Sequence, residues 1–425
     1  MGGTVRKLKV KRLKVENKGG ALKILAELCR LLIGVVFIFS GFVKAVDPVG
    51  GAIKIGEYLA SFGLDMLQPF TVLLSFNLSA IEFALGVCML LGVYRRYVSF
   101  LVLAFMAFMT PLTLYLALFD PVSDCGCFGD ALVISNWETF FKNIVLSLAA
   151  IVTFIYNQRL FQCFTFRVYW FVALYAYMFG VGFAYYNYNH LPVIDFRPYK
   201  VGANIPELME IPEGAPQDEY KYTFVYEKDG VKKEFSLEDY PANDSSWTFV
   251  DSKTELVKKG YQPPVAAFNI YNGEGDDVTE EIIGNPGPVL LLVAPKLEEA
   301  DDEQMDEING VYDYALEHDI PFYCVTGSSP EAIDAWSDNT GAEYPFRMAD
   351  EVLLKTIIRS NPGLVLLKGG TILGKWHYND IPAEEDVKAV MDRCLDGSKI
   401  KSKEDGGPRN QPIDFYRTFA ARLDV

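Results

Sequence analysis

The chain has 425 residues, half of them hydrophobic, and a formal net charge of −16. This length suits two or three domains, and the apolar content is high for a wholly soluble protein. Residues 1–190 carry 16 basic and 10 acidic residues, a net +6, whereas residues 191–425 carry 23 and 45, a net −22. An acidic surface repels phosphate backbones, which argues against nucleic acid as a partner.

Basic residues are concentrated in the N-terminal segment, residues 1–23, directly before an apolar run. They are Arg6, Lys7, Lys9, Lys11, Arg12, Lys14, Lys18 and Lys23. A cleavable signal peptide would have a shorter basic region and a small-residue cleavage site. We therefore expect a cytoplasmic N-terminus followed by a retained first helix in contact with membrane lipid.

Five apolar segments reach the length of about 20 residues that a membrane span needs. They are Ile24–Val46, Leu67–Val93, Tyr97–Phe119, Trp137–Tyr156 and Val168–Tyr188. The positive-inside rule places the N-terminal cluster and the arginines of the two short loops on one cytoplasmic face, as five spans require. The loop 120–136 and everything after His190 are then expected in the periplasm of a bacterial inner-membrane protein.

The segment 50–65 lies between the first two predicted spans. Its apolar residues can be placed on one side of a helix, which would lie along the outer membrane surface. They are Ile53, Ile55, Tyr58, Leu59 and Phe62. A re-entrant segment or a loop fits the same residues equally well.

Among the ionisable residues inside the predicted spans, Glu82 falls near the middle of the second span, and Arg30 and Lys44 lie toward opposite ends of the first. Burying a charge in the membrane costs about 2.5–3.5 kcal/mol, so Glu82 should face the bundle interior with a partner or be protonated. Arg30 is the nearest candidate partner, whereas Lys44 is expected to snorkel to the outer interface. Glu82 could serve as a helix–helix lock, and a cofactor-binding or proton-linked role for these residues is equally open.

The loop after the third span contains Cys125 and Cys127, separated by a single glycine. Outside the cytosol, a close thiol pair tends to be oxidised or to cycle through disulfide exchange. A disulfide between these two cysteines would close a small, strained ring and would therefore be readily reduced. The pair is our candidate catalytic site, and it could pass electrons between a soluble thiol protein and a membrane quinone.

Two other readings of this loop stay open. Asp124 and Asp130 could join the two cysteines in holding a metal ion, although one Cys-x-Cys pair falls short of a zinc pattern. A purely structural disulfide that pins the loop is the second reading. Among the remaining cysteines, buried single thiols are expected, with a Cys324–Cys394 disulfide as an alternative.

Three motifs carry a resemblance to known families: Ser40-Gly41-x-x-Lys44 in the first span, Glu82 in the second, and Cys-Gly-Cys-Phe-Gly-Asp after the third. Over residues 24–156 the chain resembles the DoxX and MauE families of four-helix membrane proteins. DoxX proteins accompany thiosulfate:quinone oxidoreductase, and MauE is implicated in maturing a disulfide-rich periplasmic enzyme. The resemblance implies redox-associated roles for these motif residues. This chain departs from both families by adding a fifth span, within residues 157–190, and a large outer domain.

The outer part divides into a β-rich linker region, residues 191–261, and an α/β domain, residues 262–396. The linker contains a hairpin signal, Tyr222–Tyr226 and Val231–Phe235 around a Lys-Asp-Gly turn. In the domain, strands alternate with helices and end in a hairpin, which predicts an α/β layer fold. The expected strands are Val289–Ala294, Pro321–Thr326, Gly363–Leu367 and Ile372–Tyr378, and the expected helices are Glu303–Glu317, Pro330–Thr340 and Ala383–Cys394.

This order of elements resembles a thioredoxin-like domain of the TlpA or peroxiredoxin type. Pro362 stands where such domains carry their cis-proline. A catalytic thioredoxin would have a Cys-x-x-Cys after the strand ending at Ala294, but the segment Pro295–Asp302 contains no cysteine. The resemblance therefore implies a binding module, which could hold a partner or fold over the cysteine loop. Residues 397–425 are expected to form a flexible tail.

The leading hypothesis is an α-helical membrane bundle with a soluble thioredoxin-like domain, in which Cys125 and Cys127 exchange disulfides or electrons with an extracytoplasmic thiol protein. A quinone is the candidate cofactor. The alternative is a non-enzymatic scaffold or assembly factor whose degenerate thioredoxin-like domain binds a protein partner. The sequence leaves open whether the chain is an enzyme.

Overall fold

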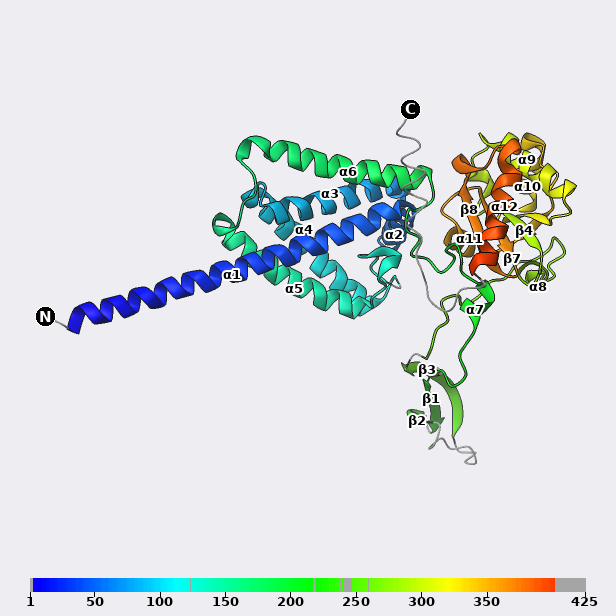
Figure 1. Ribbon diagram of the computed structural model, residues 1–425. Helices are drawn as coiled ribbons and strands as arrows, with labels where there is room; N and C mark the ends of the chain where they lie inside the picture. The colour runs from blue at the N-terminus through cyan, green and yellow to red at the C-terminus, as the bar shows by residue number, and fades with distance from the viewer. Residues whose placement is uncertain are drawn as a thin grey trace.

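The computed structural model describes residues 3–122, 124–216, 219–228, 230–236, 239, 247–258 and 260–401. It consists of a helical bundle, a small β-sheet and an α/β domain that lies against one end of the bundle (Figure 1). The N-terminal end of helix α1 extends beyond the opposite end of the bundle. Most of the predicted tail, residues 402–425, lies outside the described residues.

The membrane bundle consists of six helices with short 3-10 turns between them. They are α1 (Gly3–Val46), α2 (Pro48–Ser61), α3 (Thr71–Leu91), α4 (Arg95–Phe119), α5 (Asn136–Ile155) and α6 (Tyr169–Asn189), with turns η1 (Asp65–Phe70), η2 (Gly129–Ala131), η3 (Asn157–Arg159) and η4 (Phe166–Val168). Within the described residues, four segments are long and apolar enough to cross a membrane: 65–91, 95–119, 136–155 and 166–189. These coincide with the second to fifth predicted spans. The first predicted span is the C-terminal half of α1, and a total of five spans stays a prediction.

Helices α1 and α3 run antiparallel and touch through glycines. A Cβ atom on Gly41 of α1 would lie 2.4 Å from the backbone nitrogen of Phe83 and 2.7 Å from the carbonyl oxygen of Ser79. A Cβ atom on Gly86 of α3 would lie 2.6 Å from the backbone nitrogen of Ile38. Small residues let membrane helices approach this closely. The contact fixes the register of the two helices that carry the polar residues described below.

The sequence of the segment 50–65 was compatible with a surface helix, a re-entrant segment or a loop. In the structure, residues 48–61 form helix α2. Asp47 caps it by accepting a 2.8 Å hydrogen bond from the backbone N–H of Gly50. The buried face of α2 differs from the predicted stripe. It consists of Pro48, Ala52, Gly56 and Leu59. Only Leu59 belongs to both sets, because the small residues of α2 are the ones that pack closely.

The predicted hairpin in the linker region is confirmed, and a third strand completes an antiparallel sheet. Its strands are β1 (Glu219–Lys228), β2 (Val231–Ser236) and β3 (Thr248–Lys258), in the order β2–β1–β3. This sheet projects away from both the bundle and the α/β domain (Figure 1). The sequence analysis missed β3.

The α/β domain has a mixed sheet in the order β6–β5–β4–β7–β8, with β4, β5 and β6 parallel and β7 and β8 antiparallel to their neighbours. The strands are β4 (Pro288–Ala294), β5 (Phe322–Thr326), β6 (Phe346–Met348), β7 (Gly363–Lys368) and β8 (Thr371–His377). The helices are α7 (Ile205–Met209), α8 (Thr279–Ile283), α9 (Met305–Glu317), α10 (Pro330–Thr340), α11 (Glu351–Ile357) and α12 (Glu384–Lys401), with turns η5 (Leu297–Glu299) and η6 (Tyr378–Asp380).

The predicted α/β class and all four predicted strands of this domain are confirmed, whereas β6, α8 and α11 were missed. Two features differ from expectation. The domain begins before residue 262, because Tyr199 and Ile205 are buried in its core, at 3% and 1% exposure. Helix α12 also continues past Cys394 to Lys401. The Asn361–Pro362 bond is cis, and Cys324 and Cys394 are both free thiols.

The α/β domain is held to the end of the bundle that carries the cysteine loop, residues 120–135. Arg359 donates to the carboxylate of Asp47 at 2.9 Å, and it lies 3.5 Å from a carboxylate oxygen of Asp130. His190, after α6, contacts Asp380 at 2.8 Å. The cysteine loop and the α/β domain therefore share one side of the molecule.

The glycine contact between α1 and α3 yields a stability prediction. Gly41→Ala puts a methyl group against the backbone of α3, so we expect a loss of about 1–3 kcal/mol in the free energy of unfolding. Thermal unfolding of the purified protein in detergent measures this. Gly182→Ala in α6 is the matched control, because a Cβ there meets no atom within 4 Å. Equal melting temperatures for the two variants would show that the contact does not matter.

Candidate functional site

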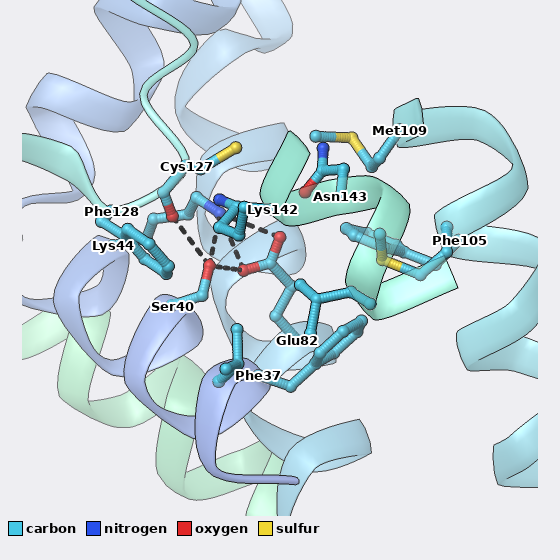
Figure 2. A pocket seen from close by; sticks show the side chains of 13 residues that line it. Phe37, Ser40, Lys44, Glu82, Phe105, Met109, Cys127, Phe128, Lys142 and Asn143 are labelled. Atoms are coloured by element: carbon cyan, nitrogen blue, oxygen red, sulfur yellow. Dashed lines mark hydrogen bonds and ion pairs between the residues drawn. The ribbon is translucent and has the colours of Figure 1, made fainter. Parts of the chain in front are cut away.

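Ser40, Lys44 and Glu82 form one buried polar network between α1 and α3. The Nζ of Lys44 donates to both carboxylate oxygens of Glu82, at 2.9 and 2.7 Å, and to the hydroxyl oxygen of Ser40 at 3.0 Å. The Ser40 hydroxyl lies 2.7 Å from Glu82 Oε2 and 2.8 Å from the carbonyl oxygen of Cys127. Ser40 and Lys44 are one helical turn apart, so both face the same point on α3. The network joins two helices to the cysteine loop (Figure 2).

The predicted partner of Glu82 was wrong, and so was the predicted environment of Lys44. Arg30 instead pairs with Glu27 at 2.6 Å and donates to the carbonyl oxygens of Met89 and Leu90 at the end of α3. Lys44 does not snorkel outward, since its side chain is only 11% exposed. In the antiparallel packing, ten residues of α1 separate Arg30 from Ser40, about 15 Å along the helix.

The cysteine loop is held by its backbone carbonyl groups. Tyr58 of α2 donates to the carbonyl oxygen of Cys125 at 2.8 Å, and Ser40 makes the corresponding contact with Cys127. Between the cysteines, Gly126 has φ +61°, a conformation that favours glycine. Its N–H donates to Asp124 at 2.8 Å. Both thiols are free and buried, at 7% and 8% exposure.

The two thiols differ in acidity. A hydrogen bond from the Cys127 thiol lowers the pKa of Cys125 to about 6, with further help from the charge of Lys142. The Cys127 N–H also points to the Cys125 sulfur, at 3.3 Å. The same hydrogen bond, together with burial, raises the pKa of Cys127 well above its usual range. The surroundings therefore favour the thiolate form at Cys125 and the thiol form at Cys127.

Cys127 lines a small cavity in the bundle with a volume of about 30 Å³. Its polar end is formed by the Ser40 network with Lys142 and Asn143, and its walls are apolar (Figure 2). The apolar lining consists of Val36, Phe37, Phe105, Met106, Met109, Phe128 and Leu146. Lys142 Nζ lies 4.1 Å from the centroid of the Phe128 ring. Cys127 thus lines a partly apolar cavity together with the Glu82 carboxylate and the amines of Lys44 and Lys142.

The remaining predicted site residues lie around this centre without joining it. Asp124 pairs with Lys54 at 3.0 Å, and Asp130 faces Arg359. Burial and the neighbouring Asp47 raise the pKa of Asp130. Pro362 belongs to the α/β domain and does not line the cavity. Within the part of the chain that the structure describes, no three His, Cys, Asp or Glu side chains are grouped for a metal ion.

Sequence reasoning missed the contribution of α5. Thr139, Lys142, Asn143 and Leu146 have the i, i+3, i+4, i+7 spacing of one helical face. The Thr139 hydroxyl also lowers the pKa of Cys125, and it has no nitrogen or oxygen partner among the described residues. A lysine inside an apolar segment was the signal that could have found this face, because such residues are costly unless they serve a purpose.

The asymmetry of the thiols yields a pH prediction. Because the pKa of Cys125 is about 6, its alkylation rate should reach a plateau above that pH. In Lys142→Met the plateau should move toward the ordinary thiol pKa of 9.0, so that alkylation slows between these two values and recovers at high pH. Mass spectrometry of the 120–135 segment follows the reaction. Lys54→Met is the control, because this loop-side lysine is not among the charges that lower the pKa. Identical profiles for Lys142→Met and the wild type would contradict the assignment.

Comparisons with known proteins cover two parts of the chain. Residues 22–156 match the family described as "Methylamine utilisation protein MauE", and residues 220–259 match a "Domain of unknown function (DUF8463)". No curated protein matches the chain. One solved structure, the solution structure of a "putative protein disulfide isomerase from Bacteroides thetaiotaomicron", is 18% identical with a TM-score of 0.26, covering 32% of this chain and 89% of its own. A TM-score this low carries no argument about the α/β domain. The MauE match includes Ser40, Lys44, Glu82 and both loop cysteines, so the membrane bundle is MauE-like, as the sequence motifs indicated.

Proposed function

We propose that this membrane protein performs thiol–disulfide exchange at Cys125 and Cys127. The observation that carries the proposal is a pair of free, buried cysteines one glycine apart, with the Cys127 N–H 3.3 Å from the Cys125 sulfur and Lys142 nearby to lower the pKa of Cys125. Thiolates are the attacking species in disulfide exchange, and the best attacking thiols have pKa values near the ambient pH. A purely structural pair would need no thiol with a lowered pKa.

The exchange runs in two steps. The Cys125 thiolate attacks a disulfide of the partner protein, which forms a mixed disulfide and releases one partner sulfur as a thiolate. Cys127 then loses its proton and attacks the Cys125 sulfur, which releases the second partner sulfur as a thiolate. The products are a Cys125–Cys127 disulfide and a reduced partner, so two electrons pass from this chain to the partner. The reverse sequence oxidises a partner dithiol.

The proposed location is the periplasmic face of an inner membrane, with an extracytoplasmic disulfide-containing protein as the partner. Arg95 donates to the carbonyl of Leu160 at the end of the bundle remote from the cysteine loop, which fits the positive-inside orientation. The α/β domain lies at the loop end. Its sheet order supports a thioredoxin-like module. Because the segment after β4 has no cysteine, we assign this module to docking the partner.

A protein disulfide is favoured over a quinone as the direct partner of Cys125. The bundle cavity has a volume of about 30 Å³, far below the roughly 300–1,000 Å³ of pockets that hold organic ligands. The scaffold alternative leaves the chemistry of the thiols unexplained. The double variant Cys125→Ala, Cys127→Ala distinguishes the two. It should lose function if the chain performs the exchange, and it should keep function if the chain is only a scaffold.

Trapping variants test the exchange directly. Cys127→Ser should accumulate a mixed disulfide through Cys125, because the second step is blocked, whereas Cys125→Ser should accumulate none. A membrane-impermeant thiol reagent followed by mass spectrometry measures both outcomes in cells and in purified protein. The proposal fails if the wild-type pair stays in one redox state through oxidant and reductant treatment and neither variant traps a partner.

A further inference from the structure

We infer that Glu82 is the proton acceptor for the Cys127 thiol in the second step of the exchange, with Lys44 and Ser40 holding its carboxylate in place. This role rests on the proposed thiol–disulfide exchange. It assigns a catalytic role to the buried ion pair of the bundle. A pair that only locked two helices together would not need to line the same cavity as a thiol.

The second step needs a base, because the Cys127 thiol is buried and must lose its proton before it can attack. Its side chain lines the bundle cavity, and of the described residues that line this cavity, Glu82 is the only carboxylate. A general base can act directly or through one water. A polar cavity end with the carboxylate, the two lysines and Asn143 offers the two to four partners that an ordered water requires.

A count of hydrogens shows that the network can receive one more proton. The described network has five short contacts. Lys44 makes three, two with the Glu82 carboxylate and one with the Ser40 hydroxyl. The Ser40 hydroxyl makes the other two, one with Glu82 and one with the Cys127 carbonyl oxygen. An ammonium group supplies three hydrogens and a hydroxyl supplies one, which makes four. A proton on Glu82 supplies the fifth. Glu82 can then donate to Ser40, while Ser40 donates to the carbonyl oxygen of Cys127.

The transfer also keeps the charge inside the cavity constant. The charged and titratable groups that line the cavity with Glu82 are Lys44 from α1, Lys142 from α5 and Cys127 from the cysteine loop. Helix α4 presents Phe105, Met106 and Met109, and α6 contains no charged residue. Moving the proton turns a carboxylate and a thiol into a carboxylic acid and a thiolate. The proton transfer itself therefore adds no charge to the cavity, and the thiolate forms beside two ammonium groups.

The complete second step balances as follows. The Cys127 S–H bond breaks and its proton goes to the Glu82 carboxylate. The Cys127 sulfur then bonds to the Cys125 sulfur, the bond between Cys125 and the partner sulfur breaks, and that sulfur leaves as a thiolate with the electron pair. Glu82 afterwards releases its proton to solvent, and the network returns to its starting state.

The test follows the two steps separately in the purified full-length chain. An aromatic disulfide reagent, dithionitrobenzoate, loads Cys125 as a mixed disulfide, and mass spectrometry of the 120–135 segment follows its conversion to the Cys125–Cys127 disulfide. The key variant is Lys44→Met with Glu82→Gln, which removes both charges and so leaves no unpaired buried ion. We expect loading to proceed at the wild-type rate and conversion to slow by about 100-fold, the usual contribution of a general base.

Two further variants separate proton transfer from simple positioning. Ser40→Ala removes the contacts with Glu82 and the Cys127 carbonyl but keeps the carboxylate, so conversion should slow less than in the double variant and should keep the weak pH dependence of the wild type. Glu82→Asp keeps a carboxylate and should convert faster than the double variant. Conversion by the double variant should also rise steeply with pH, as hydroxide replaces the missing base, whereas the wild-type rate should change little.

If the double variant converts the mixed disulfide at the wild-type rate, Glu82 is not the proton acceptor, while the proposed exchange still holds. Equal slowing in Ser40→Ala and the double variant would assign the network to positioning only, which also overturns the inference. If the wild-type chain loads but never converts, or never loads, the proposed exchange itself fails. The three results are therefore distinguishable.

Discussion

The buried pair of Lys44 and Glu82 sets the conditions for the rest of the bundle. A single charge inside a membrane bundle is costly, and removing one partner of a buried pair leaves the other uncompensated. The two side chains must therefore meet, which fixes the register of α1 against α3. The glycines of these helices allow the backbones to approach closely enough for Ser40 to reach both the carboxylate and the cysteine loop. Packing and electrostatics thus impose the same arrangement.

The cysteine loop inherits its geometry from that arrangement. Its backbone is fixed at two carbonyl groups, by Ser40 from α1 and by Tyr58 from α2. With the backbone fixed, the two sulfurs face different surroundings. Cys125 accepts a hydrogen bond from the backbone N–H of Cys127, whereas Cys127 lines the cavity that also contains the buried carboxylate. A pair of chemically identical residues becomes an attacking thiolate and a resolving thiol because the protein surrounds them unequally.

Arg359 ties the α/β domain to the same centre. Its guanidinium group contacts Asp47, which caps α2, and Asp130, which ends the Cys-Gly-Cys-Phe-Gly-Asp run of the loop. One side chain from the domain therefore touches both segments that hold the cysteines. The Arg359 side chain is 8% exposed and Asp47 is 16% exposed, so their ion pair is largely shielded from solvent, whereas Asp130 is 45% exposed. A partner docked on the α/β domain would lie at the cysteine end of the bundle.

From the sequence we could predict the apolar spans, the alternation of strands and helices, and the hairpin of the linker region. We could also predict the candidate residues Ser40, Lys44, Glu82, Cys125 and Cys127. These follow from local patterns, such as length, periodicity and short motifs. The pairing of Glu82 with Lys44 and not with Arg30 is visible only in the folded bundle, because helix register depends on contacts between residues far apart in the chain. The same reason explains why Lys142 was missed. Its role depends on a neighbour seventeen residues away across a turn, and no local pattern encodes that distance in space.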